Sequence, residues 1–485
     1  MDIKQLKDDA LAGKVSIEML IEIITDLMSK IKDLEGKNPT PRLDEAYSEK
    51  AEAKRKNKKQ RRPKLPKRRR GRVTTAEKIA NAQRTEKVYP DECDAAKCQY
   101  SHTRVAWRLE NGTAVLVAYE IYRCGKWYGK PAGLSGRSEF GIEIVIALSY
   151  QVYCLGLSID KAIQLLSFFQ QLKLSKSQAD ALLNQLARQW ESEFEKLCEL
   201  LANSAVVHCD ETSWSINSVW AFLNDKLTVL FYGVHKDNST LSEILDKETF
   251  DGVLVSDNAA VYKNFNQAQK CWAHLIRKAI KLTLQSRENE VYRTFADGLL
   301  EIYRKAKKAA SDGRLGDQGR KKRVEDLKEA VYRLCRDRWL DDSTDGDTTE
   351  EDYRRLCNEI INLHINDELF TFVLNDGVDG NNNAAERQLR GDALARETDR
   401  TNKTPNGAKR QSIISSVIQS IGKQLETFTL EAVIAEVQRW EQCGRSCFEE
   451  LINKLGLNSP SRKARSDPNK SLLDQLILEA DTSPE

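Results

Sequence analysis

The sequence predicts a multidomain α+β protein, and three observations carry that prediction. The chain has 485 residues, which is enough for two or three domains and a sizeable core. Between residues 204 and 258, short apolar runs separated by turn residues are typical of β-strands. Long segments on both sides of this region, at 138–202 and 261–374, are helical by pattern. Strands and helices segregated along the chain favour an α+β fold.

Composition narrows the class of protein. No apolar run reaches the ~20 residues that a membrane-spanning helix needs. The opening residues, MDIKQLKDDALAGK, are polar and mixed in charge, so we expect no secretory signal. The eleven cysteines are scattered, which is more typical of a reducing cytoplasm than of a disulfide framework. We therefore expect a cytoplasmic protein with no membrane partner.

The first segment, 1–35, predicts a helix with heptad character. Five apolar residues in it follow a 4-3-4-3 spacing, namely Leu20, Ile24, Leu27, Ile31 and Leu34. This seam lasts only about two to three heptads. Two interpretations stay open: a short helix for oligomerisation, or a helix that packs on its own domain.

The next segment, 36–89, has the composition of a disordered linker with a strongly basic tract. The first 72 residues carry 21 Lys and Arg against 12 Asp and Glu, and thirteen of the nineteen residues at 54–72 are basic. Such a tract is either a solvated tail or a contact to nucleic-acid phosphates, which needs no fixed structure. Nucleic acid is favoured over a membrane surface because apolar anchors are missing. The predicted contacts include Lys54, Arg55, Arg61, Arg62, Lys67, Arg68, Arg69 and Arg70.

A small β-rich module is predicted at 90–135. Three thiols and an imidazole in it are a donor set that holds tetrahedral zinc in many small domains. The spacing is loose and contains no Cys-x-x-Cys pair, so unligated cysteines are the favoured alternative. The candidate zinc ligands are Cys93, Cys98, His102 and Cys124.

Helices are expected at 136–203, with Ser158 and Ser175 as N-caps. A helix, a short turn and a capped helix fit a helix-turn-helix DNA-binding unit. A generic pair of antiparallel helices explains the same pattern equally well, and pattern alone does not separate the two.

The remaining chain is divided by its changes of period. Residues 204–274 carry four predicted strands, with Asn224 and Asp225 as a turn pair. A helical insertion is expected at 275–375, a polar loop opening into a helix within 376–457, and a polar tail at 458–485.

Three acids stand at comparable places in these elements. Asp210 is expected to end the first strand, Asp257 ends the fourth, and Glu386 lies in the first turn of a helix. Acids at such positions can converge at one edge of a sheet, where they repel unless cations neutralise them. Mg²⁺ prefers carboxylate oxygens and keeps room for water and phosphate. Two such ions can bind the attacking and leaving oxygens of a phosphoryl transfer. For any single acid, a cap or surface ion pair is the simpler explanation.

Four motifs in order give the chain a family resemblance. HCDET, LVSDNAAVY, CWAHLIRK and NNNAAERQLR together resemble the DDE transposases of the bacterial insertion sequence family sixty-six. The resemblance covers most of the chain, and NNNAAERQLR is its most specific part. It implies an RNase H-like catalytic core, a mixed sheet with helices, interrupted by a helical insertion. One departure stands out, because members commonly carry two Cys-x-x-Cys pairs in the module before the helical region.

The resemblance also implies an activity and its partners. Asp210, Asp257 and Glu386 would be the catalytic, metal-binding triad for two Mg²⁺ or Mn²⁺ ions. The implied reaction is hydrolytic nicking of the ends of a mobile element, followed by joining of the freed 3′-OH to target DNA. Expected partners are DNA, as terminal inverted repeats and target, a second copy of the chain at least, and small accessory proteins. The implied location is the bacterial cytoplasm, associated with the nucleoid when bound to DNA.

For residues near the triad, alternative roles stay open. Arg387 and Arg390 follow the glutamate, and Arg390 shares its helix face, so it pairs with Glu386 or contacts a phosphate. Cys271 and His274 are one turn apart and either ligate a metal or, as we favour, pack beside the site. Glu211 should point to the face opposite Asp210.

Two alternatives to an active transposase remain, a non-catalytic or repurposed DNA-binding protein and a nuclease that cuts without joining.

Overall fold

A computed structural model describes residues 73–91, 93–339, 348–398, 400–457 and 471–482. The predicted heptad helix and the basic tract lie outside the described residues, as does most of the polar tail. Residues 1–74 and 75–485 form separate units, and the second unit is described below. No helix in the described part of the chain is long and apolar enough to cross a membrane.

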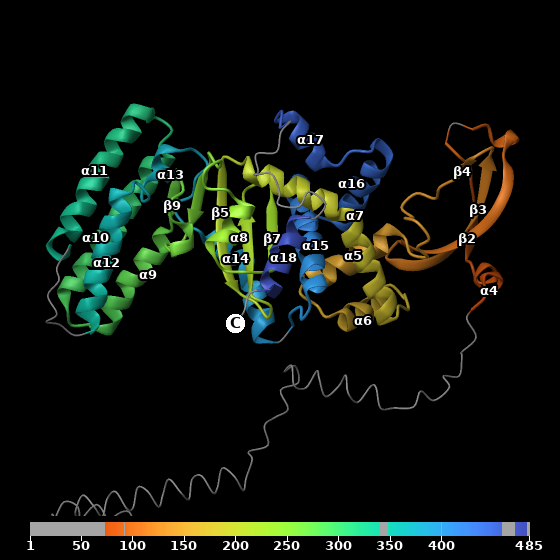
Figure 1. Ribbon diagram of the computed structural model, residues 1–485, viewed down its shortest axis with the longest axis horizontal. Helices are drawn as coiled ribbons and strands as arrows, with labels where there is room; N and C mark the ends of the chain where they lie inside the picture. The colour runs from red at the N-terminus through yellow and green to blue at the C-terminus, as the bar shows by residue number, and fades with distance from the viewer. Residues whose placement is uncertain (1–72, 92, 340–347, 399, 458–470, 483–485) are drawn as a thin grey trace, which may run out of the picture. The chain divides into compact units, whose positions relative to one another are not determined.

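A twisted sheet covers the segment predicted as a small β module and starts earlier, at residue 84, inside the segment 36–89 that was expected to be a disordered linker (Figure 1). After helix α4 (Thr75–Ala80), strand β1 (Arg84–Val88) pairs in parallel with β3 (Thr113–Cys124). Strand β2 (Gln99–Glu110) pairs antiparallel with β3, and the short β4 (Trp127–Tyr128) pairs antiparallel with the last two residues of β3. Asn111 and Gly112 join β2 to β3 with φ values of 48° and 77°, the left-handed pair that a tight hairpin requires.

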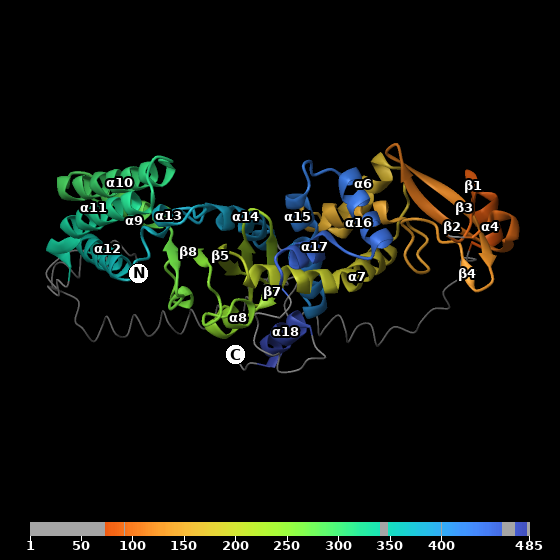
Figure 2. The same ribbon diagram turned by 90° about the horizontal axis from the view of Figure 1, so that it is seen from above.

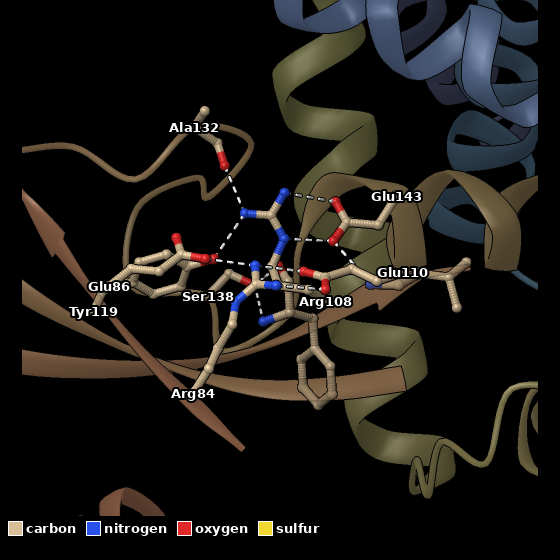
Figure 3. A network of polar contacts seen from close by, with 10 residues as sticks. Arg84, Glu86, Arg108, Glu110, Tyr119, Ala132, Ser138 and Glu143 are labelled. Atoms are coloured by element: carbon tan, nitrogen blue, oxygen red, sulfur yellow. Dashed lines mark hydrogen bonds and ion pairs between the residues drawn. The ribbon is translucent and has the colours of Figure 1, made fainter. Parts of the chain in front are cut away.

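A buried ion pair joins this sheet to the following helices (Figure 3). Arg108 on β2 donates from Nε to Glu143 Oε1 at 2.5 Å, and Glu143 is only 4% exposed at the start of α5. The same carboxylate accepts the backbone N–H of Leu109 at 3.1 Å. Arg108 also donates to the carbonyl of Ala132 at 2.8 Å. These bonds compensate the burial of both charges and link strand to helix.

Helices α5 (Ile142–Tyr153), α6 (Ile159–Phe169) and α7 (Lys176–Ala202) follow. The predicted caps are confirmed: Ser158 accepts from Lys161 N, and Ser175 forms a full capping box with Gln178. The apolar face of α7 is buried along its length in the same core as the central sheet. Its role in DNA binding stays a prediction.

The central sheet has the strand order β7-β6-β5-β8-β9 (Figures 1 and 2). Strands β5 (Val206–Ser213), β6 (Ser218–Leu223) and β7 (Thr228–Val234) are antiparallel neighbours. Strands β8 (Val253–Ser256) and β9 (Ala268–Lys270) add to the other side of β5 in parallel. Helix α8 (Asn238–Ile244) leads from β7 towards β8.

The outer edge of β7 is covered by helix α15 (Pro405–Gln424) through a ladder of buried serines. Three serines, each one turn apart, accept three β7 backbone N–H groups at 2.9–3.0 Å: Tyr232 N to Ser412, Leu230 N to Ser416 and Thr228 N to Ser420. An uncovered edge would leave these groups unpaired and open to another strand. The pattern Ser-x-x-x-Ser-x-x-x-Ser carries this signal in the sequence.

The predicted helical insertion packs as a second core against β8. It contains α9 (Trp272–Gln285), α10 (Glu290–Ser311), α11 (Asp317–Cys335), α12 (Thr348–Ile365) and α13 (Thr371–Leu374). Val253 and Val255 of β8 belong to this core, whereas Leu254 between them belongs to the core around β5–β7. Since side chains alternate along a strand, the two cores lie on opposite faces of the sheet. Figure 2 shows this bundle beside β8.

The chain then returns to the first core. Helix α14 (Asn383–Glu397) packs on β5 and β6, and α15 follows it. Helices α16 (Leu430–Cys443), α17 (Cys447–Lys454) and α18 (Leu472–Thr482) complete this side. Helix α18 lies in the segment expected to be a polar tail, but its residues Leu472, Leu473, Leu476 and Ile477 are buried in the first core. The described part is thus an α+β structure, whose mixed sheet brings β5, the end of β8 and the start of α14 together.

Candidate active site

Asp210 lies within β5 rather than at its end, which corrects the expected strand boundary. Strand β5 continues to Ser213 because it remains paired with β6, and Asp210 itself pairs with Ala221. Its parallel pairing with β8 covers only 206–208, so Asp210 stands just beyond the point where β5 and β8 separate. Its Oδ1 accepts the N–H of Glu211 at 3.0 Å.

Asp257 directly follows β8, as predicted. Its Oδ1 accepts the N–H of Ala259 at 2.9 Å, which fixes the turn that leaves the strand. A fully buried lysine, Lys270 on β9, is linked to this turn through Ser256. Lys270 Nζ donates to Ser256 Oγ at 3.1 Å, and Ser256 Oγ donates to the Asp257 carbonyl at 3.0 Å. Lys270 therefore acts as a positioning residue for the loop that carries Asp257.

Asn382, the fully buried N-cap of α14, fixes the helix that carries Glu386. Its Nδ2 donates to the carbonyl of Cys209 at 2.7 Å, one residue before Asp210. Its Oδ1 lies 3.3 Å from His208 Nδ1, and its backbone N–H donates to Cys271 Sγ at 3.1 Å. The side chain of Asn382 thus joins α14 to β5, and its backbone N–H joins α14 to the start of α9, which gives one asparagine of the NNNAAERQLR motif a structural role.

Glu386 lies in the first turn of α14, as predicted, and its side chain is 18% exposed. Arg277 on α9 donates from Nη2 to Glu386 Oε1 at 2.8 Å. His274 Nδ1 lies 3.6 Å from the same oxygen. The ion pair to Arg277 joins residues 109 positions apart, which the four-residue spacing of a single helix does not reveal.

The charges of the other two predicted acids act on Asp210. Burial, and then the negative charges of Glu211, Asp257 and Glu386, raise the pKa of Asp210 to about 7. Asp210, on β5, therefore carries an unfavourable charge at neutral pH, and so favours either a proton or a cation beside it. These charges come from β5, the end of β8 and α14, but the described structure does not bring ligand atoms of Asp210, Asp257 and Glu386 within 4.8 Å of one another.

Glu211 is nearer to this cluster than its strand position suggests. It points to the side of β5 that also carries Cys209, and its carboxylate accepts from the hydroxyl of Tyr262. Lys236 Nζ lies 2.8 Å from Glu211 Oε1. Burial raises the pKa of Glu211, Lys236 opposes that rise, and the charge of Asp257 adds to it. Asp257 thus interacts with acids that face both sides of β5.

Cys271 and His274 join the same region. Cys271 is the buried N-cap of α9, and together with His274 and Glu386 it offers three ligand atoms within 4.8 Å of one another. In the described ranges, no other group of three or more His, Cys, Asp or Glu residues meets that condition.

The candidate zinc ligands of the β module are brought together only in part. Cys98 and Cys124 interact, and burial followed by the charge of Cys124 raises the pKa of Cys98. His102 Nδ1 lies 3.1 Å from the hydroxyl of Ser101. Across the residues that the structure covers, Cys93, Cys98, His102 and Cys124 do not converge as one ligand set. Zinc in this module stays a prediction.

Arg387 and Arg390 are exposed on α14. The described ion pairs of Glu386 go to Arg277 and His274 on α9, not to Arg390. Both arginines are therefore free of the acid cluster and accessible to a ligand, and their contact to phosphate stays a prediction. Sequence reasoning missed Arg277 and Asn382, although both lie inside the quoted CWAHLIRK and NNNAAERQLR motifs.

Comparison with known proteins identifies the family. A search of curated proteins found no match to this chain. The family model of the Transposase IS66 family matches residues 137–410, more than half of the chain. The matched segment contains all three predicted acids together with Asn382, Cys271, His274 and Arg277. The chain therefore belongs to the Transposase IS66 family.

Proposed function

We propose that the protein is a DDE-type transposase that nicks the ends of its element and joins the freed 3′-OH to target DNA. The observation that carries this proposal is the electrostatic cluster of Asp210, Asp257 and Glu386, assembled from β5, the end of β8 and α14. The strand order supports an RNase H-like core, with three antiparallel strands followed by two parallel ones. In this fold the acids stand where the central strands separate.

The donor set fits Mg²⁺ or Mn²⁺. Carboxylate oxygens are the ligands these hard cations prefer, and the raised pKa of Asp210 supports a cation beside these acids. Asp210, Asp257 and Glu386 would hold the ions. When bound, two such ions activate the attacking oxygen and stabilise charge on the phosphate and the leaving oxygen.

The protein's own residues position the reaction. Asn382 and Lys270 hold two of the acid-bearing segments in place, from α14 and β9. Arg277 orients Glu386 through its bond to Oε1. The exposed Arg387 and Arg390, beside Glu386 on α14, are available to neutralise phosphates that flank the scissile bond. No serine or tyrosine nucleophile is needed, since water and then the DNA hydroxyl attack.

The test is a nicking assay on a DNA duplex that contains the terminal repeat of the element. In Mg²⁺ the wild-type protein should nick the end, whereas Asp257→Asn should reduce nicking by more than a thousandfold while an electrophoretic shift with the same duplex remains. Asp251→Asn is the matched control, because Asp251 is an exposed acid that precedes β8. Normal nicking by Asp257→Asn would show that the assignment of the triad is wrong.

A non-catalytic DNA-binding protein is the second candidate, and the cysteine module that departs from the family pattern is the feature that favours it. It predicts a shift of the duplex with no nicking in any divalent metal. A nuclease without joining activity would nick and fail a strand-transfer assay. Deletion of 54–72 should flatten the dependence of DNA affinity on salt in all three cases.

A further inference from the structure

Three different metal-binding side chains meet at the start of α9. Cys271 precedes the helix, His274 lies in its first turn, and Glu386 reaches them from α14. Their ligand atoms all lie within 4.8 Å of one another. Donors around a tetrahedral zinc ion stand about 3.5 Å apart, so shifts of about 1 Å would complete this set. His274 Nδ1 and Glu386 Oε1 are already at 3.6 Å.

The nitrogen donor, His274 Nδ1, and the sulfur donor, Cys271 Sγ, are positioned to bind a metal ion. His274 Nδ1 is shielded from solvent and has no hydrogen-bond partner in the described structure, which is costly for a buried polar atom. Cys271 Sγ accepts the backbone N–H of Asn382 at 3.1 Å, so its position is fixed relative to α14. The Nδ1 atom of His274 faces the Glu386 carboxylate, and this carboxylate forms an ion pair with Arg277.

The donor chemistry differs from that of the acid cluster. A thiolate, an imidazole and a carboxylate suit Zn²⁺, with a water as fourth ligand, whereas Mg²⁺ takes oxygen ligands alone. Binding would replace the Cys271 thiol proton, which passes to solvent, and would leave Arg277 to pair with the other oxygen of Glu386 or to move away.

We propose that Cys271, His274 and Glu386 form a zinc site whose occupation withdraws Glu386 from the acid cluster. The site shares a single carboxylate with the triad, so zinc in it and a catalytic ion that needs Glu386 compete for the same ligand. Zn²⁺ is then an inhibitor of strand cleavage even when Mg²⁺ is in excess. The inhibitory half of this proposal rests on the proposed function, and the binding half does not.

Cobalt absorption tests the binding half on the full-length, chelator-treated protein. Titration with Co²⁺ should give one equivalent with the visible bands of tetrahedral cobalt and a near-ultraviolet thiolate-to-cobalt charge-transfer band. Zn²⁺ should remove both. Cys271→Ser should abolish the charge-transfer band, and His274→Ala should weaken Co²⁺ binding more than tenfold. Serine at 271 can still accept the N–H of Asn382, so the fold should survive, and circular dichroism checks this.

Two controls identify the site. The double variant Cys98→Ser/Cys124→Ser should keep the band, because these cysteines belong to the β module. Asp210→Asn should also keep it, since Asp210 belongs to the acid cluster alone. A charge-transfer band that persists in Cys271→Ser, or that vanishes in the β-module variant, would overturn the site.

Nicking in the presence of Zn²⁺ tests the inhibitory half. One equivalent of Zn²⁺ in excess Mg²⁺ should slow wild-type nicking at least tenfold, relative to the same protein without Zn²⁺. The same ratio for Cys271→Ser should be near one. Equal inhibition of both proteins would refute the withdrawal of Glu386. If no protein nicks in any metal, the proposed function fails while the cobalt spectrum still decides the site.

Discussion

The acid cluster should destabilise the metal-free protein, and Asp210→Asn should relieve this cost. The pKa of Asp210 rises from 3.8 to about 7, chiefly because of burial and the neighbouring negative charges. A shift of about three units at about 1.4 kcal/mol per unit gives an upper bound of about 4 kcal/mol. Since the folded-state pKa is raised, protonation favours the folded state. The free energy of unfolding therefore falls as pH rises from about 4 to about 7.

Urea unfolding of wild type and variant, with a chelator present, measures this effect. At pH 8 the variant should be more stable by about 2–4 kcal/mol, and at pH 5 by about half of that or less. Asn retains the oxygen that accepts the N–H of Glu211, so no bond is lost. Mg²⁺ should stabilise wild type more than the variant. Asp326→Asn, on the exposed face of α11, is the control. Equal stability of variant and wild type at pH 8, or a gain independent of pH, would refute the reasoning.

Three further substitutions probe how the site is held. Asn382→Ala removes the bond to Cys209, so unfolding should become easier by about 1–3 kcal/mol in urea, and nicking should fall with DNA binding retained. Ser416→Ala leaves the N–H of Leu230 unpaired beneath α15 and should cost about 1–3 kcal/mol in the same measurement. Arg108→Met leaves the buried carboxylate of Glu143 without its cationic partner. The free energy of unfolding should fall by about 3–5 kcal/mol, measured by thermal or urea unfolding.

Each of these substitutions has a counterpart that should do little. Asn362→Ala and Ser311→Ala change exposed residues on α12 and α10 and should stay within about 0.5 kcal/mol of wild type. Adding Glu143→Leu to Arg108→Met should restore part of the lost stability, because the uncompensated charge is gone. A double variant no more stable than Arg108→Met would contradict the ion-pair explanation.

The parts of the fold that local sequence determines were predictable. Ser158 and Ser175 cap helices because their hydroxyls reach backbone N–H groups three residues on. The Asn224 side chain accepts the N–H groups of Lys226 and Leu227, as expected of a turn. The burial of β8 follows from its apolar run, and Asp257 follows that strand as expected.

The parts that depend on distant contacts were not predictable in the same way. β5 runs past Asp210 because β6 continues to pair with it. The three-residue β9 is too short to show a period and exists because it pairs with β8. Glu386 pairs with Arg277 on α9, not with Arg390 on its own helix. Residue spacing within one helix cannot predict a contact to a second helix.

The most direct test of the acid cluster is anomalous diffraction from Mn²⁺ in a crystal of the protein bound to a DNA end. We expect manganese peaks at the carboxylates of Asp210, Asp257 and Glu386, with ligand distances of about 2.0–2.3 Å. The peaks should disappear when Asp257→Asn is crystallised in the same way. Manganese bound elsewhere, with these three carboxylates uncoordinated, would contradict their assignment as the metal-binding triad.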